Sequence, residues 1–446
     1  MQRILKWPLI LFAVALAGFL LFAPGIVERS MNKILPVAAK AGPRALALHK
    51  TLAIADMHSD TLMWQRDVLD LASRGHVDLP RLEDGHVALQ VFSSVSKTPK
   101  GQNYDANGSD SDNITLLTIA QLQPPRTWSS ILERSLYHAS KLQRAADNSG
   151  GRLRFIQTSA DLAKLLADRA HGQQVTGAVF SVEGLQNLEG KLANLDRLQA
   201  AGIRMAGLTH FFDNEVAGSM HGIKKGGLTP LGRQVVTELE RRHIIVDIAH
   251  SSHKTVADVL AMAKRPVVSS HGGVQATCKV NRNLTDDEIR GVAKTGGVIG
   301  IGYWDAAVCG TEPAKVAQAI AHVRDLVGID YVGLGSDFDG ATTTGFDTSK
   351  LALVTQALMD RGFSEAEIAK VMGGNVLRVL GIRVDRYLVM PRILAAITMT
   401  PALTAYATLM GLLGGAAISV MYFNVSWVTY KAESFHYITF SEIIKG

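Results

Sequence analysis

Eight short apolar runs alternate along the chain with segments of helical apolar spacing, and this alternation limits the fold more than any other feature. Continuous apolar runs of this length are typical of parallel strands that are buried on both faces. Strands that each lead into a helix predict an α/β fold, a (β/α)8 TIM-type barrel. An open doubly wound sheet is the alternative, but no G-x-G-x-x-G sequence opens a helix after the first run. The predicted strands are 52–57, 87–94, 177–182, 203–208, 244–248, 267–269, 297–302 and 331–335, and the clearest helices are 192–200, 230–241, 252–262 and 312–326.

Length and charge set the outer limits on domain number and partners. A chain of 446 residues with 47% hydrophobic residues can bury one full barrel and still carry extensions at both ends. The formal net charge is +6, but the first fifty residues hold seven Lys or Arg against a single acidic residue, Glu28, so the remainder is neutral. A neutral catalytic domain predicts that nucleic acid is not a partner.

An uncharged apolar segment at 7–27 dominates the N-terminus. It is preceded by Arg3 and Lys6 and is long enough to cross a bilayer, so residues 1–30 are predicted to be a signal anchor or a signal peptide. We favour an uncleaved anchor, because the apolar residues continue beyond the cleavage-like sequence Ala15-Leu16-Ala17. The basic start would stay in the cytoplasm and place the main domain outside it, in the periplasm or the extracellular space. Residues 31–50 are predicted to be a linker and residues 51–385 the barrel.

A second uncharged stretch, 393–430, lies in the C-terminal extension 386–446 and predicts membrane attachment. It is interrupted by Pro401 and by Gly414-Gly415. We favour one tilted span, because a hairpin that turns at the glycines leaves too few residues for a second pass. A buried core helix is the third alternative.

Five side chains of metal-ligand type follow the predicted strands. The carboxyl ends of barrel strands meet at one rim, where such folds carry their chemistry. His58 and Asp60 alternate around Ser59 and would point to the same side of an extended strand, so they can share one ion. His250 and His271 follow neighbouring strands and can share another.

Glu183 ends an apolar strand, where an unpaired carboxylate would be costly. It could be a salt-bridged rim residue. The alternative is a bridge between two cations. Many two-metal barrel hydrolases use a carboxylated lysine as this bridge, but no lysine ends a strand here. The sequence therefore predicts a two-metal site with Glu183 as the bridge.

Further polar residues at the rim suggest roles toward a substrate. His210 closes the fourth predicted strand and is predicted to stabilise the developing oxyanion. Asp337, the first acidic residue after the eighth strand, is predicted to move a proton, whereas Asp339 suits a structural turn. Arg282 could clamp a substrate carboxylate. Asp247 is interpreted as a buried structural acid or, less favourably, as a group that orients a ligand.

A polar insert at 96–111 follows the second strand and is predicted to be a loop on the active-site rim. The helical segment 128–146 would cover this loop or the flank of the barrel.

Taken together, these motifs resemble the membrane (renal) dipeptidase family of zinc peptidases. The resemblance covers residues 50–382. It rests on eight motifs in order, namely DMHSD, HVDLPRLEDGHVALQVFSS, SVEG, LTHFFDN, VDIAHSS, SSHGGVQATCKVNRNLTDDEI, GLGSDFDG and GGNVLRVL. The apolar C-terminal stretch departs from the common pattern of the family.

The resemblance implies a ligand set and a reaction. It implies two Zn²⁺ per chain, and it matches residues here to ligands, substrate contacts and proton transfer. It also implies a disulfide between Cys278 and Cys309. The implied zinc ligands are His58 and Asp60 for one ion, His250 and His271 for the other, and Glu183 as the bridge; the implied substrate contacts are His210, Arg282 and, less directly, Tyr303, with Asp337 in proton transfer.

We therefore expect a membrane-tethered dizinc dipeptidase in which a hydroxide held between the two metals attacks the peptide carbonyl. A deacylase or lactonase on the same scaffold is one alternative. A metal-free tethered binding protein is another. The sequence leaves open the preferred side chains and the oligomeric state, including a homodimer.

Overall fold

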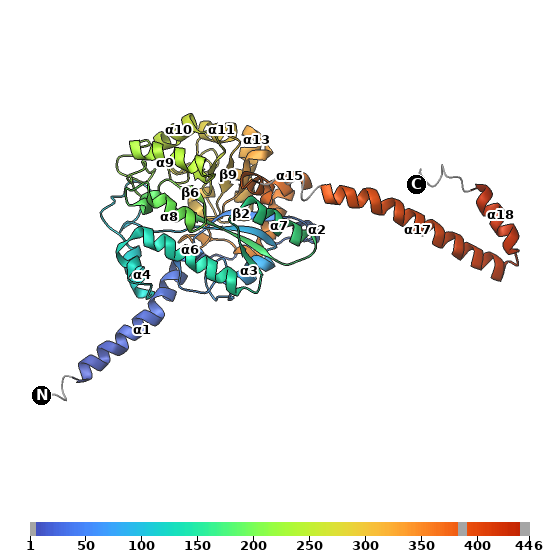
Figure 1. Ribbon diagram of the computed structural model, residues 1–446, viewed down its shortest axis with the longest axis horizontal. Helices are drawn as coiled ribbons and strands as arrows, with labels where there is room; N and C mark the ends of the chain where they lie inside the picture. The colour runs from blue at the N-terminus through green and yellow to red at the C-terminus, as the bar shows by residue number, and fades with distance from the viewer. Residues whose placement is uncertain (1–5, 382–389, 438–446) are drawn as a thin grey trace. The chain divides into compact units, whose positions relative to one another are not determined.

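A closed barrel of eight parallel strands forms the centre of the protein (Figure 1), and the predicted α/β fold is confirmed. The computed structural model describes residues 6–381 and 390–437. Around the barrel the strands follow the order β3-β2-β10-β9-β8-β7-β6-β5, and pairing of β3 with β5 closes the ring. The barrel strands are β2 (Ile54–Ser59), β3 (Val87–Phe92), β5 (Thr176–Val182), β6 (Ile203–Gly207), β7 (Ile245–Asp247), β8 (Val267–Ser269), β9 (Val298–Ile301) and β10 (Val332–Leu334).

Helices surround this barrel, and two of them begin at side-chain caps. Thr285 accepts a hydrogen bond from the backbone of Glu288 in a capping box, and Ser252 accepts one from Thr255, so each satisfies an amide that the helix leaves unpaired. The principal helices are α2 (Pro43–His49), α3 (Leu79–Asp84), α6 (Ile131–Asn148), α7 (Ser159–Ala170), α8 (Asn194–Ala200), α9 (Pro230–Arg241), α10 (His253–Met262), α11 (Asp286–Lys294), α13 (Pro313–Val327), α14 (Ala352–Asp360), α15 (Glu365–Ala369) and α16 (Asn375–Val379).

Three short strands were not predicted. β4 (Leu153–Phe155) pairs with β5 outside the ring, and β1 (Lys33–Ile34) pairs with β11 (Thr343–Thr344). The segment that was expected to be a linker therefore carries β1 and α2 and contacts the domain. The polar insert is a loop that leads into α4 (Ile114–Ala120) and α5 (Arg126–Ser129).

The N-terminal helix α1 (Lys6–Met31) is long enough to cross a membrane. Its candidate span, Ala13–Met31, is only 11% buried within the structure. It leaves the barrel near α4 (Figure 1), which it contacts.

The C-terminal unit, residues 383–446, is separate from the unit that holds the barrel. It contains α17 (Met390–Tyr422) and α18 (Trp427–Tyr437). α17 runs through Pro401 and Gly414-Gly415 without ending there. The Tyr430 hydroxyl donates to the Leu412 carbonyl at 2.8 Å, so α18 folds back along α17. The span Ile397–Tyr422 is only 6% buried, which argues against a core helix.

Candidate metal centre and active site

The predicted metal-type residues meet at the carboxyl rim of the barrel. His58 is the second-to-last residue of β2, and Asp60 directly follows that strand. Glu183 directly follows β5, and His271 lies two residues beyond β8. All of these side chains are buried, together with His210, His250 and Asp337.

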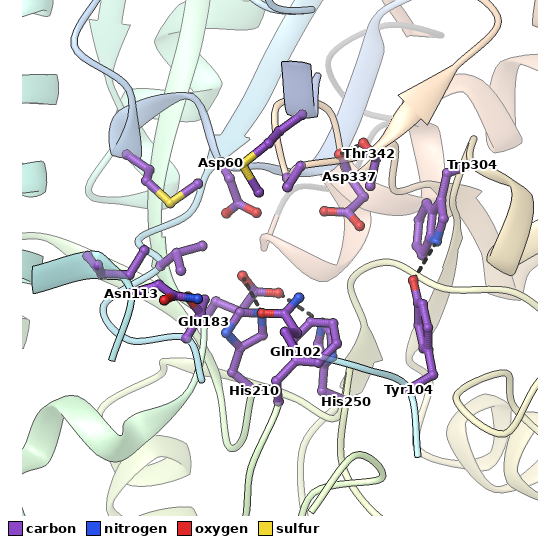
Figure 2. A pocket seen from close by; sticks show the side chains of 18 of the residues that line it. Asp60, Gln102, Tyr104, Asn113, Glu183, His210, His250, Trp304, Asp337 and Thr342 are labelled. Carbon is purple, nitrogen blue, oxygen red and sulfur yellow. Dashed lines mark hydrogen bonds and ion pairs between the residues drawn. The ribbon is translucent and has the colours of Figure 1, made fainter. Parts of the chain in front are cut away.

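Glu183 lies beside His210 and His250 in Figure 2, and its carboxylate approaches four histidines. Its Oε1 is 3.0 Å from His250 Nε2, 3.3 Å from His271 Nε2 and 3.7 Å from His58 Nε2. Its Oε2 is 3.5 Å from His210 Nε2. One carboxylate therefore faces four imidazoles, three through Oε1 and one through Oε2.

The donor atoms form three overlapping groups, each within 4.8 Å: His58, Glu183 and His271; Glu183, His210 and His250; and His58, Asp60 and Asp337. The cluster also contains buried atoms with no hydrogen-bond partner among the described residues, and a bound ion is one of the partners that would satisfy such atoms. They are His58 Nε2, Asp60 Oδ1, Glu183 Oε2 and His250 Nδ1. Imidazole and carboxylate donors fit zinc, so the residues present suit a metal centre.

The electrostatics of the cluster favour added positive charge. Burial and the neighbouring Asp60 carboxylate raise the pKa of Glu183 well above its usual value, and burial raises the pKa of Asp337 to about 7. Although burial alone would lower it, the pKa of His58 is raised to about 10 by Asp60 and Glu183. Burial lowers the pKa values of His250 and His271, which keeps both rings neutral, as metal ligands must be.

Hydrogen bonds below the rim hold these side chains in place. The Asp56 carboxylate accepts from the backbone amides of His58 and Ser336, which joins β2 to the end of β10. Asp247 accepts from the amides of Ala249 and Ser270 at 3.0 and 2.8 Å. The favoured structural role of Asp247 agrees with these contacts. The Ser270 hydroxyl lies 2.9 Å from His271 Nδ1, where it can fix the orientation of the ring.

Two of the rim residues have strained backbones. His250 has φ 63° and Asp337 has φ 57°, in the left-handed region that disfavours residues with side chains. Such conformations persist where the surrounding structure enforces them, and they are frequent at functional sites.

A cavity of about 580 Å³ opens over the cluster. In Figure 2, Asp60 and Asp337 line one side of it, opposite Glu183, His210 and His250. Its lining also includes Val27, Met31, Tyr104, Arg282 and Trp304.

Arg282 lines this cavity, and its Nη2 donates to the His271 carbonyl at 3.4 Å and lies 3.4 Å from His250 Nε2. It forms no ion pair with any described carboxylate, and its buried Nε has no hydrogen-bond partner there. Its guanidinium lies 4.7 Å from the centre of the Trp304 ring, and the Trp304 indole donates to the Tyr104 hydroxyl at 3.2 Å. The aromatic pair thus steadies a cation that is available to an anionic ligand.

Sequence reasoning missed Tyr104 and Trp304. Tyr104 lies in the polar insert, whose position after the second strand was the one available signal. Trp304 follows Tyr303, the residue that was expected to contact substrate. Tyr303 is fully buried and packs against Phe338 and Phe346, and it does not line the cavity.

The structure joins Cys278 and Cys309 in a disulfide, with 5.3 Å between their Cα atoms. The bond ties the loop that carries Arg282 to the loop that follows Trp304. It therefore stabilises one wall of the cavity.

Comparison with known proteins identifies the family. The model for membrane dipeptidases, peptidase family M19, matches residues 43–386. The chain belongs to this family. Dipeptidase aclJ of Aspergillus oryzae is 31% identical over 317 residues, which is 69% of this chain and 70% of that protein. Together with the donor cluster, these matches show that this chain is a metal-dependent dipeptidase.

Solved structures share the barrel. The probable dipeptidase PvdM from Pseudomonas aeruginosa has a TM-score of 0.64 at 22% identity, with 76% of this chain and 98% of that chain covered. A metallopeptidase from Rhodobacter sphaeroides, solved with a phosphinate mimic of the dipeptide L-Ala-D-Ala, has a TM-score of 0.60 at 23% identity, covering 74% and 98% of the chains. Separately, the model for the permease MlaE matches residues 375–446.

Proposed function

We propose that this dipeptidase holds two Zn²⁺ at the rim of the barrel and cleaves dipeptides that carry a free carboxylate. His58 and Asp60 would bind one ion, His250 and His271 the other, and Glu183 both. The observation that carries the proposal is the position of Glu183, within 3.7 Å of three of these imidazoles.

When bound, the two cations would polarise the scissile carbonyl and lower the pKa of a water molecule that attacks it. The side chains around them supply the remaining steps. His210, whose pKa burial lowers to about 3, would be a neutral donor to the oxygen that gains negative charge. Asp337, with its pKa raised to about 7, can accept a proton and return it to the departing amine near neutral pH.

The cavity would favour short substrates. Arg282 would bind the terminal carboxylate of the substrate as a charge-assisted pair. Tyr104 and Trp304 close the cavity beside it, which leaves little room for a chain that continues past this carboxylate. The L-Ala-D-Ala mimic bound by the Rhodobacter sphaeroides relative makes L,D dipeptides natural test substrates here.

The experiment that tests the proposal combines metal analysis with a substrate panel. Purified full-length protein should contain close to two zinc ions per chain and should hydrolyse L,L or L,D dipeptides. A strong chelator should abolish turnover, and added Zn²⁺ should restore it. Full activity in metal-free protein would refute the metal centre. Equal turnover of N-acyl amino acids or lactones would favour the deacylase alternative.

We also propose that the enzyme is tethered to a membrane with its catalytic domain outside the cytoplasm. The candidate spans Ala13–Met31 and Ile397–Tyr422, together with the permease match at the C-terminus, support the attachment. The disulfide supports export, because such bonds persist in oxidising compartments. α18 has only 11 residues and is too short for a second pass, which favours a single C-terminal span.

A further inference from the structure

The last two turns of α1 form part of the active-site mouth. Val27 and Met31 line the cavity above the metal-type residues. Between them lies Glu28, which is only 1% exposed although it belongs to a largely apolar helix. A buried carboxylate at this position is costly unless it is paired.

Glu28 is paired with two arginines. Its Oε1 accepts from Arg66 Nε at 2.6 Å, and its Oε2 accepts from Arg74 Nε at 2.7 Å. Arg66 is itself buried and donates through its other nitrogens to the Val77 carbonyl and to the Asp339 carboxylate. Arg74 binds Glu28 but does not contact Asp339 within the described residues, so only one of the two arginines extends the network toward the rim.

Asp339 in turn joins the two loops that carry acidic residues of the site. Its carboxylate accepts from the Thr61 hydroxyl at 2.7 Å, and its carbonyl accepts from the Trp64 indole at 2.7 Å. Thr61 directly follows Asp60, and Asp339 lies two residues after Asp337. The path from α1 therefore runs through Arg66 and Asp339 to both loops.

The loop around Asp339 needs such support. Asp337 and Asp339 have φ values of 57° and 63°, and the loop must be held in this unfavourable conformation. A side chain at Gly340 would collide with the carboxylates of Asp337 and Asp60, so the backbone passes directly against both. Small shifts of this loop would move both carboxylates.

Glu28 also separates two like charges. Arg66 and Arg74 both bind it, so removal of its charge would leave two neighbouring guanidinium groups without their shared partner. Their repulsion would displace the Arg66 side chain from Asp339, because Arg66 would also lose one of its three hydrogen bonds.

We propose that Glu28 is a positioning residue for the dipeptidase reaction: it acts through Arg66 and Asp339 to align Asp60 and Asp337. The inference rests on the proposed roles of those two acids. It assigns a function to the end of α1, which lies outside the residues 43–386 that the family model matches. Removal of a signal peptide by cleavage near Ala17 would leave Glu28 and its contact with Arg66 in the mature protein.

The test compares Glu28→Gln with Arg74→Gln in the full-length protein. Arg74→Gln is the matched control, because it removes a partner of Glu28 without touching Arg66 or Asp339. Glu28→Gln should lower kcat about tenfold or more, the range seen when a group that orients a metal-site residue is lost. KM should change by less than about twofold, since substrate contacts remain. Arg74→Gln should keep kcat near that of the wild type.

A double variant separates alignment from stability. If Glu28 acts through Arg66, Glu28→Gln should have little further effect on kcat in an Arg66→Met background, whereas independent effects would multiply. If Glu28→Gln does not fold, judged by thermal unfolding, Glu28→Asp should show a smaller loss of kcat in the same direction. The inference is overturned if the folded Glu28 variant keeps wild-type kcat, or if Arg74→Gln loses as much. An inactive wild-type protein would instead refute the proposed function.

Discussion

His210 lies where a metal ligand and a substrate contact are both geometrically possible. Its Nε2 is 3.5 Å from Glu183 Oε2, and its ring is 4.8 Å from that of His250. Because we propose that the five other donors hold both ions, we predict that His210→Ala keeps both metals. Turnover should fall about a hundredfold, the scale of losing one oxyanion donor. Metal analysis beside kcat measures both quantities.

His271→Ala is the matched comparison for that variant. It removes a proposed ligand from the same cluster and should lose bound zinc as well as activity. Loss of one zinc equivalent from His210→Ala would move this histidine into the ligand set.

Arg282 is predicted to bind the terminal carboxylate of the substrate. Arg282→Ala should lower kcat/KM for a free dipeptide by an amount equivalent to a few kcal/mol of transition-state stabilisation, since it removes a charge-assisted pair in a buried site. The same dipeptide with a C-terminal amide should be affected far less. Steady-state kinetics on both substrates decide the point, and equal losses would contradict the assignment.

The rim residues could be predicted because each follows an apolar run, and the barrel then brings the run ends together. The contacts of Tyr104 and Glu28 could not. Tyr104 lies in an insert with no periodicity, and Glu28 lies beside an apolar segment whose composition indicates only a membrane anchor. Their partners, Trp304 and Arg66, are distant in sequence.

The loops after β8 and β9 form one wall of the cavity, and two kinds of contact link them to each other. One is the disulfide, and the other is Asn283, whose amide donates to the carbonyls of Cys278, Ala306 and Ala307. Cys309 is exposed, so a reductant can reach the bond.

We predict that replacing both cysteines with serine lowers the free energy of unfolding by about 2–4 kcal/mol. KM for dipeptides should rise, because the Arg282 loop gains freedom, while zinc content stays unchanged. Thermal unfolding with and without reductant provides the control: reductant should lower the Tm of the wild type and leave that of the double variant unaltered. A wild-type Tm that is insensitive to reductant would contradict the prediction.

At the scale of elements, all eight barrel strands could be predicted from apolar runs, with ends displaced by up to two residues. β4 could not, because its three residues, Leu153–Phe155, contain a central arginine and no clear run. β1 and β11 have two residues each and exist only through their mutual pairing, which local sequence does not encode.

Buried neutral histidines make the stability of the whole barrel depend on pH. Burial lowers the pKa of His49 to about 4 and that of His138 to about 3, whereas each would titrate near 6.5 in the unfolded chain. Above pH 6.5 neither state binds the proton. Below it only the unfolded state does, so the free energy of unfolding should fall as the pH falls, by about 1.4 kcal/mol per pH unit for each residue.

Thermal unfolding between pH 7.5 and 5 measures this slope. His138→Asn, which keeps a polar group beside Ser94 but cannot titrate, should show a shallower slope than the wild type. An unchanged slope would show that His138 does not contribute.

The topology of the chain gives a prediction of its own. Reporter fusions at Gly381 and Gly446 should lie on opposite sides of the membrane if α17 crosses it once. The reporter at Gly381 should be outside the cytoplasm, because Arg3 and Lys6 precede the first span. Two external reporters would indicate a hairpin or no C-terminal span.

α1 enters the rim of the barrel as an unbroken helix, and its burial against the barrel begins at Pro24. If the residues before Pro24 lie in lipid, the cavity-lining residues Val27 and Met31 lie only about 5 and 11 Å along the helix from the bilayer. The opening of the cavity would then face lipid headgroups rather than bulk water. Folded proteins would be too large to enter that gap, whereas a small peptide released at the membrane could be captured by diffusion along the surface before it escaped into the bulk.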